Sequence, residues 1–332
     1  PPLMQRPAQW TVIDAGGTAT VVVSRHGRTR HPSVNPASVG EAVAASTLAA
    51  LFAELADTPQ AGDGAWFGTA SLDPAAPQQE LDRIRVAATA ARLSGPVVVS
   101  SDIVALLLVG LLGAGRVRQA GAVAVVSGTG SGVRAGRLDA APVTIGSLEY
   151  LASDEGSAFA LAQDGLRAAV RAGDGRGPAC TLGSRFEQRT GRPLNQLVRE
   201  LARTPFPKTA VAALADVVTQ AWQAGDPVAA GLVEQALQEL QAAVLAGVRR
   251  AALRPGWCAV LAGGVFSGCP ALRAAFSDRL AAAGAAESIP VLDPAGSLFQ
   301  SLAGASDPVP GSWLGSAVWT LEPAGRPLAR RC

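Results

Sequence analysis

Short runs of apolar residues and longer segments with a helical apolar period alternate along the chain. Residues 10–27, WTVIDAGGTATVVVSRHG, predict two strands joined by a glycine-rich turn at 15–17. Residues 121–139, GAVAVVSGTGSGVRAGRLD, repeat this plan, with a strand at 122–126, a turn at 127–132 and a short strand that ends near Asp139. The repeated hairpin indicates that the chain contains two related halves.

Other segments predict further strands and helices. A run of valines in 95–110, GPVVVSSDIVALLLVG, predicts a strand that leads into an apolar helix, with Asp102 at the joint. Residues 258–262 predict a buried strand, followed by two glycines and a helix from about Pro270. Apolar residues between 213 and 253 recur with helical spacing, interrupted at 225–227, and predict two scaffold helices. The segment from about 304 to 332 shows no clear period, so no element is predicted there.

The composition indicates a globular chain of two domains. A length of 332 residues suits two domains, and 48% hydrophobic with 16% charged residues supply ample core material. The net charge of +2, without a face of clustered Lys and Arg, argues against nucleic acid as a partner. The longest apolar run, 103–112, is shorter than the ~20 residues of a membrane span, and the N-terminus lacks the apolar core of a signal peptide. We therefore expect a cytoplasmic protein without a membrane partner.

The positions of cysteine and histidine argue against several kinds of site. The two histidines lie together in one early loop, at His26 and His31. No pair of cysteines has CxxC spacing, the four being Cys180, Cys258, Cys269 and Cys332. Neither a zinc site nor a Ser-His or Cys-His catalytic triad is therefore expected.

The glycine turns of the two hairpins are candidates for binding phosphate. Each turn by itself has an ordinary explanation, because glycine supplies the positive φ of a tight turn. Together, glycines flanked by Thr and Ser expose backbone N–H groups and hydroxyls that can surround phosphate oxygens from two sides. The candidate donors are Gly16, Gly17 and Thr18 in the first turn and Gly128, Thr129, Gly130 and Ser131 in the second. A third glycine pair, Gly263 and Gly264, either lets a nucleobase approach the backbone or is a plain strand-to-helix turn.

The order of these motifs resembles the N-acetylglucosamine kinase group within the BadF/BadG/BcrA/BcrD ATPase family. DAGGTAT is similar to the first phosphate loop of that group, SGTGSG to the second, and LAGGVF to its adenosine motif. SDEGSAFALAQDGLRAAVRAGDGRGP, residues 153–178, resembles its most recognisable block, and the likeness runs from about residue 11 to 298. The resemblance implies an α/β fold of two actin-like ATPase (ribonuclease H-like) domains with a cleft between them. We expect these domains at 1–115 and 116–332.

The resemblance also implies a reaction. The expected protein transfers the γ-phosphate of Mg·ATP to a hydroxyl, by analogy the 6-OH, of an amino sugar or hexose such as N-acetylglucosamine or glucosamine. Asp102 would be the catalytic base, and the alternative is a plain helix N-cap. Asp14 would hold Mg²⁺ through water, and the alternative role of Asp14 is that of an acidic residue that stabilises the turn. The glycines and hydroxyls of the two hairpin turns would bind the phosphates, and the adenosine-binding residues would be Gly263, Gly264 and Val265.

Five residues are candidates for sugar binding: Asn35, Gly68, Thr69, Asp154 and Glu155. By resemblance, Asn35 and Asp154 would contact sugar hydroxyls, although Asn35 also fits a turn and the two acids also fit a cap of the helix at 158–171. The family carries Gly-Trp-Gly upstream of this block and a glycine just before its Asp, where this chain has Ser147-Leu148-Glu149 and Ser153. The choice among glucosamine, glucose, another hexose and a modified sugar therefore stays open.

Two other functions compete with a kinase. The altered sugar block would suit a non-catalytic nucleotide or sugar sensor, which keeps the scaffold but not the reaction. An ATPase that activates a dehydratase would need cysteines placed to hold an iron–sulfur cluster between subunits, and neither Cys258 nor Cys269 lies where such a cluster would require. The expected partners are a sugar and ATP, with the choice between monomer and homodimer open.

Overall fold

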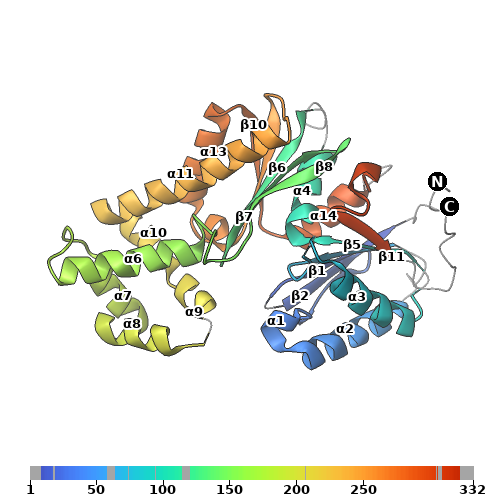
Figure 1. The fold of residues 1–332 in the computed structure, drawn as a ribbon, viewed down its shortest axis with the longest axis horizontal. Helices are drawn as coiled ribbons and strands as arrows, with labels where there is room; N and C mark the ends of the chain where they lie inside the picture. The colour runs from blue at the N-terminus through green and yellow to red at the C-terminus, as the bar shows by residue number, and fades with distance from the viewer. Residues whose placement is uncertain are drawn as a thin grey trace. The chain divides into compact units, whose positions relative to one another are not determined.

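The computed structural model describes residues 9–17, 19–57, 64–73, 75–93, 95–113, 120–205, 207–303, 305 and 309–321. The chain divides into two compact units (Figure 1). Unit 1 comprises Pro1–Ala114, Leu138–Pro142 and Asp293–Cys332, and unit 2 comprises Gly115–Arg137 and Val143–Leu292.

Unit 1 is built on a six-stranded sheet in the order β11-β5-β4-β1-β2-β3. Its strands are β1 (Trp10–Ala15), β2 (Ala19–Ser24), β3 (Gly27–Pro32), β4 (Gly64–Thr69), β5 (Val97–Ser101) and β11 (Val318–Leu321). Strands β1, β4 and β5 are parallel, β1 pairs antiparallel with β2 and β2 with β3, and β11 pairs antiparallel with β5. The first predicted hairpin is therefore β1–β2, with its turn at the carboxyl end of β1.

Helices cover this sheet because its central strands are apolar on both faces. The helices of unit 1 are α1 (Pro36–Val39), α2 (Glu41–Ala56), α3 (Gln78–Ala90), α4 (Asp102–Leu112) and α14 (Pro294–Ala303), with a 3₁₀ turn at Gly311–Trp313. Phe52 of α2 and Ile84 of α3 join Phe67 of β4 in one buried core. Trp66 and Val98 are buried on the other face, since successive side chains of a strand alternate. Helix α4 contacts β4 and β5, and α14 contacts β1 and β2.

Unit 2 repeats the strand pattern of unit 1. Its sheet has the order β10-β9-β6-β7-β8, with strands β6 (Ala122–Ser127), β7 (Ser131–Arg137), β8 (Ala140–Gly146), β9 (Trp257–Ala262) and β10 (Ala285–Val291). Strand β6 pairs antiparallel with β7 and parallel with β9, and β9 pairs parallel with β10. In unit 1, β1 likewise pairs antiparallel with β2 and parallel with β4, and β4 pairs parallel with β5. The prediction of two related halves is confirmed.

The helices of unit 2 are α6 (Ala158–Gly173), α7 (Leu182–Thr190), α8 (Leu194–Arg203), α9 (Lys208–Ala212), α10 (Ala215–Gln223), α11 (Pro227–Arg250), α12 (Gly264–Gly268) and α13 (Pro270–Ala282). Figure 1 shows α6 to α10 gathered at one end of the unit. Helix α11 contacts β7 and β6. Asp226 caps α11 by accepting hydrogen bonds from Val228 N (2.9 Å) and Ala229 N (3.0 Å). The predicted break at 225–227 therefore separates α10 from α11, whereas the short helix α12 was not predicted.

The C-terminal segment differs from the sequence-based division, which placed it in a second domain at 116–332. Residues from Asp293 onward group with unit 1, because β11 hydrogen-bonds to the outer edge of β5 and α14 packs on α4 and β1. Trp313 Nε1 also donates to Ala140 O at 2.7 Å. Ala140 begins β8, and the segment 138–142, which includes the start of that strand, groups with unit 1. The expected boundary at 115/116 lies outside the described residues. No helix in the described ranges is both long and apolar enough to cross a bilayer.

Candidate functional site

The turn between β1 and β2 is tight and packed. Gly16 N donates to Ala19 O (3.1 Å), and Ser33 Oγ donates to Gly16 O (2.9 Å). A Cβ added at Gly17 would lie 3.3 Å from Ser38 Oγ, so a larger residue there would require the Ser38 side chain to move slightly. Gly17 is exposed, which leaves its backbone accessible to a ligand. Thr18, predicted to bind phosphate beside it, lies outside the described residues.

Asp14 lies in an acidic environment at the end of β1. Burial, followed by the negative charges of Asp102 and Asp293 and partly opposed by Arg28, raises the pKa of Asp14 from 3.8 to about 6. Asp293 was not predicted as part of the site; it lies next to α14, accepts a hydrogen bond from Gly296 N (3.1 Å) and pairs with Arg28. Excess negative charge at a partly buried carboxylate favours a bound cation.

These groups fit the Mg²⁺ that the resemblance implies. In the part of the chain that the structure describes, no three His, Cys, Asp or Glu side chains are placed to hold a metal together. Mg²⁺ takes one or two carboxylates and keeps water or substrate oxygens as its other ligands, so a full protein cage is not required. Asp14, with its raised pKa, is the residue that would hold the ion.

Asp102 begins α4 directly after β5. Ser101 occupies the N-cap position, and Asp102 Oδ1 accepts a hydrogen bond from Ile103 N at 2.8 Å. Asp14 is in register with Gly68 of β4, and Thr69 with Ser101 of β5, so the carboxyl ends of three parallel strands meet at one edge. Gly68 lies close to the start of α4: a Cβ added there would contact Ala105 Cβ (3.6 Å) and the Cα of Asp102 (3.9 Å). The edge of the sheet therefore brings Asp14, Gly68 and Asp102 together, as expected at a ligand-binding edge of an α/β unit.

Asn35 and Thr69 have structural roles in this conformation. Asn35 is 8% exposed, and its Oδ1 accepts from Ala37 N (2.9 Å), which caps α1. Its Nδ2 has no acceptor among the residues described, so the amide remains available as a donor. Thr69 is fully buried, and its hydroxyl is hydrogen-bonded to Ser71 Oγ at 2.7 Å. The sugar contacts expected of both residues stay predictions.

The predicted second phosphate loop, residues 127–131, is hydrogen-bonded to the block that follows it in the sequence. Gly128 N donates to Gly130 O (2.9 Å), and Gly128 O accepts from Ala158 N (2.8 Å) at the start of α6. Ser131 N donates to Asp154 Oδ1 (2.8 Å), and Ser131 Oγ donates to Glu155 O (2.8 Å). Ser131 therefore anchors the loop here, and the N–H groups of Thr129 and Gly130 have no acceptor among the described residues.

Asp154 is buried beside this loop in an unusual backbone conformation. It is 4% exposed and has a φ of +74°, which residues other than glycine rarely adopt. Its Oδ2 lies 2.8 Å from the ammonium of Lys208, a residue that sequence reasoning did not single out. The cap of α6 is Ser157, whose Oγ accepts from Ala160 N (3.1 Å), so the side chain of Asp154 is not needed for that role.

A cavity of about 380 Å³ adjoins the second phosphate loop. Residues from two separately predicted motifs line this cavity: Gly128 and Thr129 of the loop, and Gly264 and Val265 of α12. Its other walls come from α9, α10 and their connection, which no sequence signal indicated: Thr209, Ala212, Ala213, Ala215, Asp216 and Thr219. Gly263 lies at the turn before α12 with a φ of +108°, and a Cβ there would lie 2.3 Å from Ser127 O. Glycine is therefore required where this turn meets the end of β6.

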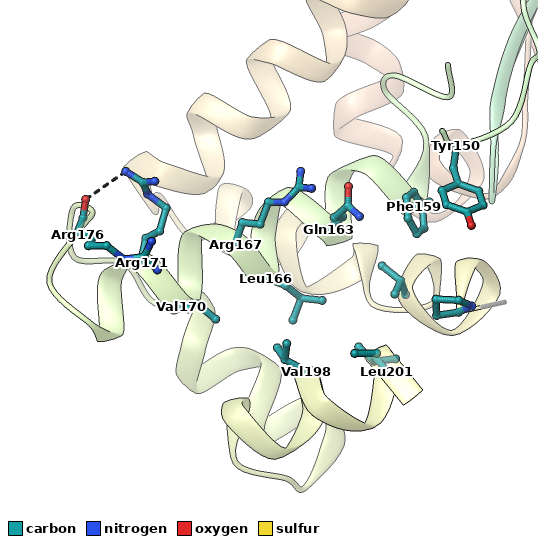
Figure 2. A pocket seen from close by; sticks show the side chains of 13 residues that line it. Tyr150, Phe159, Gln163, Leu166, Arg167, Val170, Arg171, Arg176, Val198 and Leu201 are labelled. Carbon is teal, nitrogen blue, oxygen red and sulfur yellow. Dashed lines mark hydrogen bonds between the residues drawn. The ribbon is translucent and has the colours of Figure 1, made fainter. Parts of the chain in front are cut away.

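A second cavity of unit 2, of about 550 Å³, contains none of the predicted site residues. Figure 2 shows Tyr150 and Phe159 at one end, Leu166 and Val170 of α6 along one wall, and Val198 and Leu201 of α8 opposite. The start of α6 and helix α9 separate the two cavities: Ala158 and Ala212 line the smaller one, whereas Phe159 and Val211 line the larger.

Of the three described cysteines, Cys258 and Cys269 are buried and Cys180 is partly exposed. Cys258 and Cys269 are 0% and 3% exposed, and burial followed by the charge of Glu287 raises the pKa of Cys258 to about 12. Iron–sulfur clusters are held by thiolates, and a buried thiol with a raised pKa is a poor source of one. Within the described residues, no observation favours the dehydratase-activating alternative.

Two sheets of one strand pattern, each with a glycine turn after its first strand, define a two-domain actin-like ATPase fold. The chain belongs to the BadF/BadG/BcrA/BcrD ATPase family, whose model matches residues 109–295. Both the family and the α/β fold class expected from the sequence are thereby confirmed. No curated protein matches the sequence.

Solved structures resemble the whole fold. A proposed N-acetylglucosamine kinase from Chromobacterium violaceum is 21% identical, with a TM-score of 0.65, and the likeness covers 89% of this chain and 100% of that one. A proposed N-acetylglucosamine kinase from Porphyromonas gingivalis is 18% identical, with a TM-score of 0.66 and coverage of 88% and 98%. A glucokinase of the ROK family from Streptomyces griseus, in complex with glucose and AMPPNP, is 17% identical, with a TM-score of 0.51 and coverage of 87% and 96%. At these identities the likeness establishes the fold.

Proposed function

We propose that the protein is an ATP-dependent sugar kinase that transfers the γ-phosphate of Mg·ATP to a hydroxyl of an amino sugar or hexose. The observation that carries the proposal is the placement of Asp102, at the carboxyl edge of the parallel strands of unit 1, in the electrostatic environment of Asp14. Phosphoryl transfer needs an oriented nucleophile, a base and charge-stabilising groups around the phosphates, and little else from the protein. Membership of an ATPase family and a fold shared with a glucokinase support the proposal.

Asp102 is the base in this mechanism. One carboxylate oxygen is held by Ile103 N, which fixes the orientation of the carboxylate. Asp102 accepts the proton of the attacking sugar hydroxyl as that hydroxyl forms its bond to phosphorus, and ADP leaves with the electron pair of the broken P–O bond. Asp14 would hold the Mg²⁺, which when bound would supply positive charge near the phosphate oxygens. The backbone N–H of Gly17, in the turn next to Asp14, is the proposed partner of the transferred phosphate, together with Thr18. Gly16 N already donates to Ala19 O, so Gly16 shapes the turn that presents them.

Unit 2 binds the nucleotide. Thr129 and Gly130 offer backbone N–H groups, which have no acceptor among the described residues, to the remaining phosphates. The cavity of about 380 Å³ receives the nucleoside between α12 and the α9–α10 segment. Gly264 and Val265 form one wall of this cavity, and the turn at Gly263 places them there. Because the protein uses ATP, the reaction would take place in the cytoplasm.

Sugar recognition is assigned to Asn35, Gly68, Asp154 and Glu155, with Thr69 contributing through its backbone. Asn35 Nδ2 is a donor without a partner among the described residues, and Glu155 is exposed. Glu149 belongs to the Ser147-Leu148-Glu149 segment, which by resemblance stands where the family carries Gly-Trp-Gly, and it pairs with Lys208 (2.6 Å). N-acetylglucosamine and glucosamine phosphorylated at the 6-OH are the first substrates to test, with glucose and other hexoses next.

The test measures ADP release with Mg·ATP and a panel of hexoses and amino sugars, with and without N-acetylation. We expect release that depends on one sugar class and falls at least a hundredfold in Asp102→Asn, since general-base catalysis contributes about 10²–10⁴. Asp82→Asn, at an exposed acid on α3, is the matched control and should behave as wild type. Binding of ATP and sugar without any release would instead identify the sensor, the alternative that the altered segment at 147–149 favours.

A further inference from the structure

Lys208 is the single lysine of the chain, and it pairs with Asp154, the carboxylate that anchors the second phosphate loop through Ser131 N. It is the first residue of α9, and its side chain is 21% exposed. Its ammonium lies 2.8 Å from Asp154 Oδ2, 2.6 Å from Glu149 Oε2 and 5.8 Å from the centre of the Tyr150 ring, which Figure 2 shows at the end of the larger cavity. Burial lowers the pKa of Lys208, but the carboxylates of Asp154 and Glu149 outweigh it and raise the pKa overall.

Asp154 places a carboxylate directly behind the loop. Its Oδ1 is 2.8 Å from Ser131 N, and a Cβ added at Gly130 would lie 2.8 Å from both carboxylate oxygens. A buried negative charge at this position would repel the phosphates of a nucleotide, because charges interact strongly where water is excluded. The loop can combine this anchor with an anionic ligand only if the charge of Asp154 is neutralised.

We propose that Lys208 is a positioning residue that neutralises Asp154, so that the loop at 127–131 keeps its anchor and still accepts the phosphates of a nucleotide. The proposal rests on the nucleotide-binding part of the proposed function, and because Asp154 is also a proposed sugar contact, its test measures nucleotide binding in the absence of sugar. Asp154 is the partner that matters, since it is buried, whereas the Glu149 side chain is 74% exposed and its pairing is screened by solvent. The next residue, Thr209, lines the smaller cavity, so α9 joins this charge pair to the wall of the nucleotide site.

The charge argument separates ligands with phosphates from ligands without them. Removing Lys208 alone leaves an uncompensated carboxylate beside the phosphates, which weakens ATP and ADP but not adenosine. Removing Lys208 and the charge of Asp154 together restores neutrality, and Asn can still accept the hydrogen bond from Ser131 N. A pair that only stabilises the fold would affect adenosine and ATP alike and would not be rescued by the second substitution.

The experiment measures the binding of ATP and adenosine by titration calorimetry to the full chain and its variants. We expect Lys208→Met to weaken ATP at least tenfold while adenosine changes less than threefold, and Lys208→Arg to retain most of the ATP affinity. The double variant Lys208→Met/Asp154→Asn should bind ATP within threefold of Asp154→Asn alone. Arg203→Met, which removes an exposed cation from α8, is the control for net charge and should change ATP affinity less than twofold.

Three results would overturn the proposal: unchanged ATP affinity in Lys208→Met, an equal loss for adenosine, or no recovery in the double variant. If Lys208→Met does not fold, Lys208→Gln gives the same comparison with a polar group left beside Asp154. Failure of the wild type to bind ATP would overturn the nucleotide part of the proposed function and this proposal together, whereas failure of sugar dependence alone would leave the Lys208 comparison decisive.

Discussion

Asp14 should lower the stability of the ligand-free protein at neutral pH, and Asp14→Asn should raise it. The carboxylate is partly buried next to the charges of Asp102 and Asp293, and Arg28 compensates only in part. Asparagine has nearly the same shape but cannot ionise, so the substitution removes the charge and little else. A residue selected to hold a cation is expected to be unfavourable when the cation is absent.

The size of the effect follows from the pKa. Burial and the neighbouring acids raise the pKa of Asp14 from 3.8 to about 6, a difference of roughly 2.2 units. At about 1.36 kcal/mol per unit, the ionised carboxylate costs up to about 3 kcal/mol of unfolding free energy. The sign is set by protons: between pH 3.8 and about 6 the folded state binds more protons than the unfolded state, so stability falls as pH rises through this window.

The assay is urea unfolding in EDTA, followed by tryptophan fluorescence. Trp66 is a buried reporter of unit 1, in register with Val12 on β1 and hydrogen-bonded to Ser100 Oγ (3.0 Å). At pH 8, Asp14→Asn should exceed wild type by up to about 3 kcal/mol, and the two should converge below about pH 4. Millimolar Mg²⁺ should raise the midpoint of wild type but not of the variant. Asp82→Asn, an exposed acid on α3, should match wild type at both pH values.

Equal stability of Asp14→Asn and wild type at pH 8 would refute this reasoning, and so would a difference that persists unchanged at pH 4. The first result would mean that water already solvates the Asp14 carboxylate or that Arg28 already neutralises its charge. The second would mean that the variant acts through packing rather than charge.

Three further predictions concern backbone geometry and helix caps. Gly263→Ala should destabilise unit 2 by roughly 2–4 kcal/mol in urea unfolding and weaken ATP binding, because φ is +108° and the Cβ would lie 2.3 Å from Ser127 O; Gly231→Ala, with open space on α11, is the control and should be neutral or slightly stabilising. Asp226→Ala should cost about 2 kcal/mol at pH 7, since it removes the cap of α11 and the bonds from Thr181 N and Oγ1. Burial raises the pKa of Asp226, but the hydrogen bonds that the carboxylate accepts outweigh burial and lower the pKa overall. The stabilisation by Asp226 is therefore present above pH 3.8, and thermal unfolding should show that this stabilisation is lost in more acidic buffer. Asn35→Ala should cost about 1 kcal/mol through the α1 cap and raise KM for the sugar with little change in KM for ATP.

Much of the fold could be predicted from local sequence. The hairpins β1–β2 and β6–β7, the strand–helix joint at Asp102 and the break before Pro227 all depend on residues close together in the chain. Glycine turns, runs of valine and an Asp-Pro cap are local signals, and each formed the expected element. The edge strand β11 escaped prediction, because its four residues become a strand only when β5 supplies hydrogen-bonding partners.

The candidate site was predictable in part for the same reason. The sequence by itself determined the two glycine turns, the acid after β5 and the glycine pair after β9, since turn geometry requires particular residue types at particular spacings. Tertiary structure alone decided that Asp293 contributes its charge to Asp14, that α9 and α10 line the smaller cavity of unit 2, and that Lys208 pairs with Asp154, 54 residues away in the sequence. Charge and burial act through space and leave no local pattern, so the contacts that set the chemistry of this site become visible only once the chain is folded.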